Sequence, residues 1–309
     1  MTALAVTPPS NRWIYAAIAV LIALSISIQV VRDRGWQPYE PANPVLWLPS
    51  GTLVKRLALG FENVVADVYW MRAVVYYGSK RLEEEKTRNF ELLYPLLDVV
   101  TAVDPEFKVA YRFGSIFLTE GYPNGPGRPD QAIALLERGI ERDGSRWEYM
   151  QDIGFVYYWW LRDYEAAAEW FDRAGDQKDA PTWLKPLAAT TLARGGNRVS
   201  SRFLWKQILG NTDVDWLRRS ALHRLSQLDA MDAIEQLNQI AARYAARTGR
   251  PPHTWQDLIS GEGLHGAPLD PSGVPFELDP ATGLATVSRR SSLWPLPTDP
   301  TIPPAALRQ

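Results

Sequence analysis

Residues 147–180 read WEYMQDIGFVYYWWLRDYEAAAEWFDRAGDQKDA. This stretch predicts two antiparallel helices that join at a turn around Asp163. Its small and aromatic residues recur in the order that close packing of two helices needs: Ile153-Gly154 and Tyr157, then Ala167, Phe171 and Ala174. Small residues let the two backbones approach, and aromatic rings fill the space beside them.

The same order recurs elsewhere in the chain. Residues 107–140 predict a second pair, although the segment GYPNGPGRP at 121–129 is too rich in Gly and Pro to be helical. Residues 62–105 predict an earlier pair, residues 181–209 a weaker later one, and residues 215–226 a closing helix. We therefore expect a mostly α-helical solenoid, since stacked helix pairs bury a continuous core only against their neighbours.

This pattern resembles the tetratricopeptide repeat (TPR) family over residues 62–226. The resemblance implies a right-handed superhelix of helical hairpins, here assigned to residues 59–228, whose concave face binds peptides or partner proteins. Two departures from the family pattern are Gly144, where a proline is common, and the insertion at 121–129. Because of them, the family's peptide-contacting residues are not transferred to positions in this chain.

Composition excludes several classes of function. The net charge is −2 with no basic stripe, so we expect no nucleic-acid partner. Cysteine is absent, which excludes disulfides, thiolate metal sites and a catalytic thiol. The 13 Trp and 13 Tyr residues are interpreted mainly as bulky fillers between helix pairs.

A membrane anchor is predicted near the N-terminus. Residues 13–31 carry no charge and are long enough to span a bilayer, with Trp13 and Tyr15 placed as interfacial anchors. They follow a short tail, residues 1–12. The alternatives are a cleaved signal peptide and a buried helix; against the former, no small-residue cleavage site precedes Arg32.

The charge rule barely decides the orientation of this anchor, because arginines flank it on both sides. A short head before a large body favours an inner, cytoplasmic-membrane protein of the single-pass type, with its body in the periplasm or otherwise outside the cytoplasm. Residues 32–58 are predicted to form a proline-rich spacer.

A small α+β module is predicted at 229–290. It begins with a helix at 229–248, which Gly249 ends, and it closes with a β-hairpin whose DPATG turn places Gly283 at positive φ. Residues 291–309 carry five prolines and are predicted to be a disordered tail, with an extended partner-binding segment as the alternative.

Part of this module resembles the C-terminal region of bacterial type II secretion pseudopilins. The matching residues are Trp255 and Leu258, then Asp270-Pro271, Gly273, Pro275 and Phe276. The resemblance implies an envelope assembly such as a pilus or secretion machine. It does not carry over the family's calcium site, because no carboxylate follows Val287 until Asp299.

No catalytic, cofactor-binding or metal-binding residues are predicted, and no small-molecule substrate. The histidines His223, His253 and His265 have no metal-ligand spacing, and no nucleophile elbow or phosphate-binding glycine loop is present. Asp270 and Asp279 each precede a proline and are interpreted as turn-capping residues rather than as cation ligands.

One cluster is a candidate partner-binding site. Tyr157, Tyr158, Trp159 and Trp160 are four consecutive aromatic residues, more than one face of a helix can bury. At least one is expected to point outward, where it can grip a protein partner. Packing against the next helix pair is the alternative.

The leading hypothesis is a membrane-anchored scaffold or adaptor that mediates protein–protein interactions. Confinement at a membrane raises local concentration, so that weak contacts suffice to hold an assembly together. The alternative is a permanent accessory subunit of a membrane enzyme or transporter. No sequence feature points to an enzyme, and no cofactor is expected.

Overall fold

A computed structural model describes residues 12–35 and 48–297. The chain divides into two units, residues 1–47 and 48–309, which are described separately. The predicted N-terminal tail at 1–12 lies almost wholly outside the described residues, as do positions 36–47 of the predicted spacer and the last twelve positions of the predicted tail.

The described part of the first unit is the helix α1 (Arg12–Gly35). Most of its side chains are apolar and exposed, among them Trp13, Leu21 and Ile28. The predicted anchor at 13–31 lies entirely within α1 and is therefore helical. None of the helices in the described part of the chain combines the length and the apolarity needed to cross a membrane.

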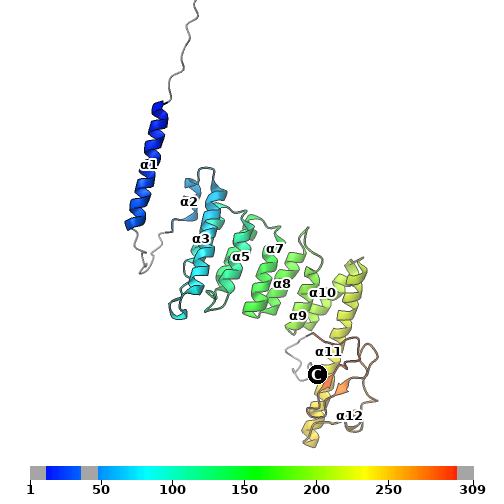
Figure 1. The fold of residues 1–309 in the computed structure, drawn as a ribbon. Helices are drawn as coiled ribbons and strands as arrows, with labels where there is room; N and C mark the ends of the chain where they lie inside the picture. Colours follow the sequence, from blue (N-terminus) through cyan, green and yellow to red (C-terminus); the bar gives the residue numbers. More distant parts are fainter. Residues whose placement is uncertain (1–11, 36–47, 298–309) are drawn as a thin grey trace, which may run out of the picture. The chain divides into compact units, whose positions relative to one another are not determined.

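The second unit is built mainly from α-helices (Figure 1). They are α2 (Gly51–Leu57), α3 (Glu62–Leu82), α4 (Leu93–Val103), α5 (Lys108–Thr119), α6 (Pro129–Arg142), α7 (Trp147–Val156), α8 (Tyr164–Gly175), α9 (Leu184–Arg194), α10 (Arg198–Asn211), α11 (Asp215–Thr248) and α12 (Trp255–Glu262). A short 3₁₀ helix, η1 (Glu85–Thr87), and a π-helical turn, η2 (Tyr157–Leu161), complete the helical part. From α3 to α12 each α-helix packs against the next one along the chain, and α2 packs against α4.

The predicted helix pairs are confirmed as α3/α4, α5/α6, α7/α8 and α9/α10. The close approach of small and aromatic residues is also present: a Cβ atom at Gly154 would lie 2.5 Å from the Phe171 ring. Gly139 is packed in the same way against Tyr149, at 2.8 Å. In each case a ring from the neighbouring helix occupies the space that a side chain on the glycine would need.

Side chains at the helix starts fix where the helices begin. Asp163 accepts a hydrogen bond from the Ala166 amide at 3.0 Å and caps α8, which is where the sequence places the turn. Asn197 caps α10 through the Ser200 amide in the same way. Residues 120–128 are not helical, as their glycines and prolines predict, and α6 begins at Pro129, where the missing N–H costs nothing.

Two segments differ from the sequence-based expectation. Residues 51–57, predicted as spacer, form α2, which Ser50 caps through the Leu53 amide. The helices predicted at 215–226 and 229–248 are one continuous helix, α11, because no Gly or Pro interrupts the chain between them. The predicted boundary at residue 228 therefore lies inside α11, which ends at Gly249 with a φ of 77°.

The predicted hairpin is confirmed. Strands β1 (Glu277–Leu278) and β2 (Ala285–Thr286) pair in an antiparallel ladder, and Gly283 in the turn has a φ of 72°. The two aspartates cap turns as predicted: Asp270 accepts from the Ser272 and Val274 amides, and Asp279 from the Ala281 amide. Burial acts to raise the pKa of Asp270, but hydrogen bonds from the Ser291 and Ser272 hydroxyls and from these amides hold it below its usual range. The Thr282 hydroxyl and the Ala281 amide lower the pKa of Asp279 in the same way.

The segment 291–297 also differs from the prediction of a disordered tail. Leu293 is buried, and the Gln227 side chain of α11 donates hydrogen bonds to the carbonyls of Leu293 and Pro295 at 2.8 and 3.0 Å. One hydrophobic core contains Leu293 together with Trp205 of α10 and Phe276. The C-terminal module and the last helix pair therefore share a core.

Candidate protein-binding site

The aromatic cluster, Tyr157–Trp160, lies in η2, the π-helical turn that ends the first helix of its pair. A π turn places one more residue in the turn than an α turn does, so consecutive side chains spread differently over its surface. The turn ends at Arg162, whose φ of 57° reverses the chain before α8.

The four side chains of this cluster divide into two pairs. Tyr157 and Tyr158 are half-buried and pack against the helical core, whereas Trp159 is 54% and Trp160 44% exposed. The structure thus directs two tyrosines inward and two tryptophans outward. Whether the tryptophans contact a partner stays a prediction.

An arginine of α9 joins the aromatic cluster to the next helix pair. Arg194 lies over the Tyr158 ring at 5.1 Å and over the Tyr164 ring at 5.8 Å, and it donates a hydrogen bond to the Tyr158 hydroxyl. The two rings meet edge to face at 5.4 Å. Cation–π contacts of this kind fix the orientation of both rings.

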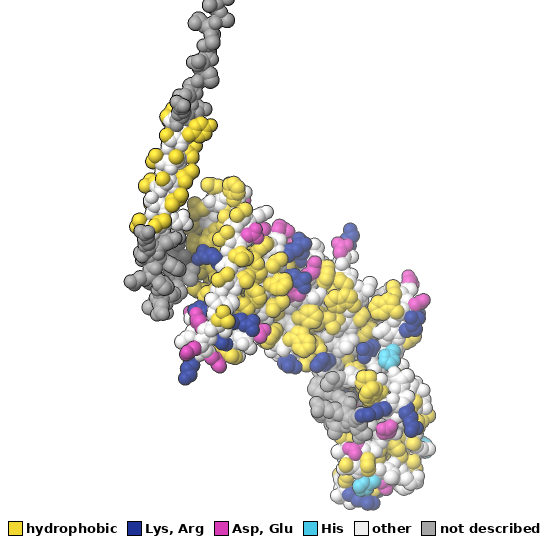
Figure 2. All heavy atoms as spheres, viewed as in Figure 1, with side chains coloured by type: hydrophobic (Ala, Val, Ile, Leu, Met, Phe, Trp, Pro, Cys, Tyr) yellow, Lys and Arg dark blue, Asp and Glu magenta, His cyan; other side chains and the backbone are white. Residues whose placement is uncertain are grey.

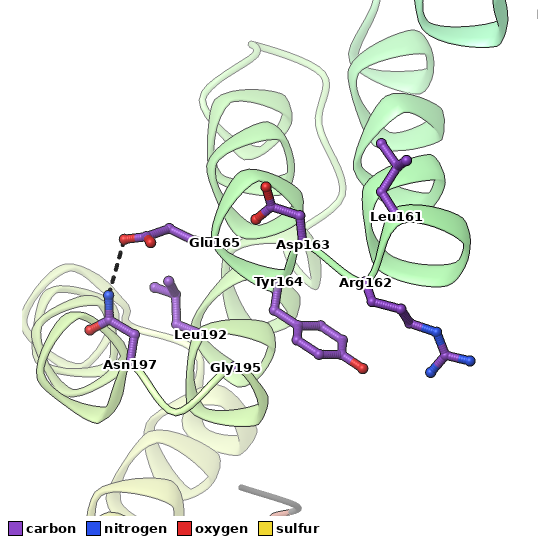
Figure 3. Close-up of a pocket in the computed structure, with 8 residues that line it drawn as sticks. All are labelled: Leu161, Arg162, Asp163, Tyr164, Glu165, Leu192, Gly195 and Asn197. Atoms are coloured by element: carbon purple, nitrogen blue, oxygen red, sulfur yellow. Dashed lines mark hydrogen bonds between the residues drawn. The ribbon is translucent and has the colours of Figure 1, made fainter. Parts of the chain in front are cut away.

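A pocket of about 400 Å³ lies at the end of η2 (Figure 3). It is lined by Leu161, Arg162, Asp163, Tyr164, Glu165, Leu192, Gly195 and Asn197. In the close-up, Arg162 points away from Asn197, and Asn197 is tied to Glu165 by a hydrogen bond of 3.2 Å. Asp163 is committed to the cap of α8, so no free nucleophile and base face each other here.

A larger exposed surface lies on α3. Val64, Val68, Met71 and Val75 are exposed and follow one another at spacings of four, three and four residues. Their side of α3 is opposite to the side that buries Ala66, Ala73 and Tyr77. This is the spacing with which a helix presents an apolar seam to another helix.

The helix α5 carries an exposed stripe of its own, formed by Val109, Phe113 and Ile116, which are also spaced by four and three residues. The two helices are in contact, since Phe117 of α5 stacks on Trp70 and Tyr77 of α3. We call the seven exposed residues of α3 and α5 the apolar face: Val64, Val68, Met71, Val75, Val109, Phe113 and Ile116. Figure 2 shows hydrophobic side chains gathered over the part of the unit that Figure 1 labels α3, α5 and α7.

A polar contact joins α5 to α7. Arg112 of α5 forms a two-pronged ion pair with Asp152 of α7, with N–O distances of 2.6 and 3.0 Å. Burial raises the pKa of the Asp152 carboxyl, and Arg112 acts to lower it.

Within residues 12–35 and 48–297, no group of three or more His, Asp or Glu side chains is placed to hold a metal ion. His223 has a pKa below its usual value, because it is partly buried and lies near Arg224. Neither His253 nor His265 is buried.

A search of protein-family models, of curated proteins and of solved structures finds no match to this chain. The assignment of a function therefore rests on the residues and their geometry.

The sequence predicted the four aromatics Tyr157–Trp160 as a candidate site without separating the tryptophans from the tyrosines, and it did not predict the apolar face. The segment 62–105 was predicted only as a helix pair, with no exposed surface assigned to it. The signal was present in the spacing of Val64, Val68, Met71 and Val75, but α3 also carries an inward stripe of Ala66, Trp70, Ala73 and Tyr77. Two apolar stripes on one helix predict a second contact surface.

Proposed function

We propose that this protein is an adaptor whose TPR-like helical solenoid binds a protein partner through the apolar face and the exposed tryptophans. The observation that carries the proposal is the exposure of apolar side chains at heptad spacing on two adjacent helices. Exposed apolar side chains gathered in this way mark interaction sites, and their spacing suits an apolar helix of the partner.

The proposal includes attachment to a membrane through residues 13–31, with the body outside the cytoplasm. Its support is the uncharged sequence of this segment and the exposed apolar side chains of α1. A chain held at a membrane meets a membrane-bound partner at high effective concentration. The pseudopilin-like segment suggests an envelope assembly as the setting.

The binding proposal predicts that Phe113→Glu weakens partner capture. A charge at the centre of the apolar face leaves an unpaired carboxylate in the interface, and loss of an anchor there costs roughly 2 kcal/mol or more, about thirtyfold in affinity. Phe113 is half exposed, so the fold is expected to survive. The measurement is co-purification of crosslinked partner from native membranes, with a photoreactive residue at Trp159.

The matched control is Val199→Glu, which places the same charge on α10 at an exposed apolar site outside the face. It is expected to leave capture unchanged. Equal loss in both variants, or no crosslink in the unaltered chain, contradicts the proposal. A second experiment distinguishes an adaptor from a permanent subunit. Tagged protein is added to the partner complex that already holds an untagged copy. An adaptor is expected to be replaced by the tagged protein, whereas a permanent subunit does not exchange.

The membrane proposal predicts protection of α1 from a water-soluble reagent. Because the chain has no cysteine, single cysteines report without background. Ile22→Cys is expected to stay unlabelled by a membrane-impermeant maleimide in intact spheroplasts, whereas the exposed Val199→Cys is labelled. Labelling of Ile22→Cys contradicts attachment to the membrane. If Val199→Cys is labelled only after the cells are lysed, the body lies in the cytoplasm and the proposed orientation is wrong.

A further inference from the structure

A second pocket, of about 290 Å³, lies between α9, α11 and the segment 295–297. Leu187, Thr190, Thr191 and Arg194 line it from one face of α9, at helical spacings of three, one and three residues. Arg224 of α11, Tyr158 of the aromatic cluster, and Pro295, Leu296 and Pro297 complete the wall.

The charged side chains that line this pocket are all positive. It is lined by two arginines, and the described residues around it include no Asp or Glu. Arg194 contacts only Tyr158 and Tyr164, through the Tyr158 hydroxyl and the two rings, among the contacts that the described residues make. Arg224 is half-buried, and burial holds the pKa of its guanidinium below the usual range.

Arg224 is held in position by a buried amide. The Gln227 Oε1 atom accepts a hydrogen bond of 2.8 Å from Arg224 Nη1, while Gln227 Nε2 donates to the carbonyls of Leu293 and Pro295. One side chain thus fixes both Arg224 and the chain segment that walls the pocket. A guanidinium has five N–H donors, and Gln227 takes one of them.

The wall also holds a polar group without a described partner. The Thr191 hydroxyl is buried, its side chain 1% exposed, and no hydrogen bond to it is found in the described part of the chain. A buried hydroxyl left unpaired is costly, and so is a partly buried cation without an anion. The cost of the partly buried cation falls when an anion occupies the pocket, whereas the Thr191 hydroxyl is too deeply buried to reach such a ligand.

We propose that this pocket binds an oxyanion, a carboxylate or phosphate group, between Arg194 and Arg224. A guanidinium presents its donors as a planar fork that matches the two oxygens of such a group. The pocket is too small for a folded partner, so the ligand is a small molecule or the acidic end of an extended one. The site goes beyond the proposed adaptor function and uses no residue of the apolar face.

The test is calorimetric titration of the full-length, detergent-solubilised protein with sodium phosphate and, separately, with sodium acetate. Sodium chloride keeps the ionic strength constant, so that only specific binding produces heat. Saturable binding of at least one anion is expected, and Arg224→Gln is expected to weaken it at least tenfold. The matched control, Arg219→Gln, removes the same charge from an exposed site on α11 and is expected to bind as the unaltered chain does.

The ratio of the two affinities identifies the group: tighter phosphate binding favours a phosphorylated ligand, tighter acetate binding a carboxylate. No saturable binding of either anion, or equal weakening by both substitutions, overturns the proposal. The chain has a carboxylate of its own close in sequence to the pocket wall. It is Asp299, two residues after Pro297 and outside the described residues, and the test must show that it does not compete with the added anion. Binding seen only after Asp299→Asn also overturns the proposal, because the pocket then holds the chain's own side chain.

A variant that fails to fold does not end the test. If the circular dichroism spectrum or melting curve of Arg224→Gln differs from that of the unaltered chain, Arg224→Lys keeps the charge and removes only the fork. It is expected to weaken binding to a similar extent. Unchanged affinity in Arg224→Lys and in Arg194→Gln together overturns the assignment of these two side chains as ligands.

Discussion

Replacing Phe171 by alanine is expected to lower the free energy of unfolding by about 3–5 kcal/mol. The ring is fully buried, fills the space above Gly154 and meets the Phe155 ring edge to face at 5.1 Å. Removing it leaves a cavity that neither helix backbone can close, because α7 and α8 are held apart by the remaining side chains. Urea unfolding followed by far-ultraviolet circular dichroism measures the loss.

The control for Phe171 is Phe203→Ala on α10, since Phe203 is 60% exposed. Its effect is expected to stay within about 0.5 kcal/mol, the usual range for a surface substitution. The double variant Gly154→Ala with Phe171→Ala gives a second check. Its loss of stability is expected to be smaller than the sum of the two single losses, because the new methyl group enters the vacated space. Strict additivity would contradict the interlock.

Trp205→Ala is expected to lower the free energy of unfolding by a similar amount, about 3–5 kcal/mol. It is also expected to destabilise the C-terminal module, which is not part of its own helix. Trp205 of α10 is nearly fully buried in the core that also holds Phe276 and Leu293 of the C-terminal module. If the last helix pair and this module share one core, the substitution loosens both. Hydrogen exchange at the Ala285 amide, which donates to Asn238 Oδ1 at 2.8 Å, is expected to accelerate.

Trp216→Ala provides the comparison, because Trp216 is the same residue type on α11 but is half exposed. Exchange at Ala285 is expected to be unchanged in this variant. If Trp205→Ala destabilises the helices yet leaves exchange at Ala285 as it was, the module folds independently and the shared core contributes little to it.

The helix pairs were predictable because their signals are local. Gly154, Phe171 and the cap at Asp163 lie within twenty residues of one another, and the small-and-aromatic order encodes a contact between neighbours in sequence. The hairpin was predictable for the same reason, since Asp279 and Gly283 define its turn. Such signals need no knowledge of distant segments.

The elements that differ from the predictions depend on distant contacts. Prolines in 291–297 suggested a free tail, but Gln227, more than sixty residues earlier, supplies the hydrogen bonds that bind this segment. Composition does not reveal such a partner. The continuity of α11 was missed because the change in pattern near residue 228 was interpreted as a boundary, although a long helix can change its packing partners along its length.

The candidate site was predictable only in part. Four aromatics in a row indicated that some must face outward, and Trp159 and Trp160 do. The apolar face was missed because exposure depends on which side of α3 and α5 their neighbours cover. Arg194 and Arg224 line the same pocket only because α9, α11 and the segment 295–297 meet there. No spacing in the sequence encodes that meeting.

Because α11 is continuous, its length fixes how the C-terminal module is rotated about the helix axis relative to α10. The helix has 34 residues and extends for about 51 Å. Arg202 of α10 grips it at Asp229 and Asp232, while β2 packs on it further along. One residue inserted between those two regions would turn the second by about 100° relative to the first. Within α11, each change of length would therefore re-aim the C-terminal module.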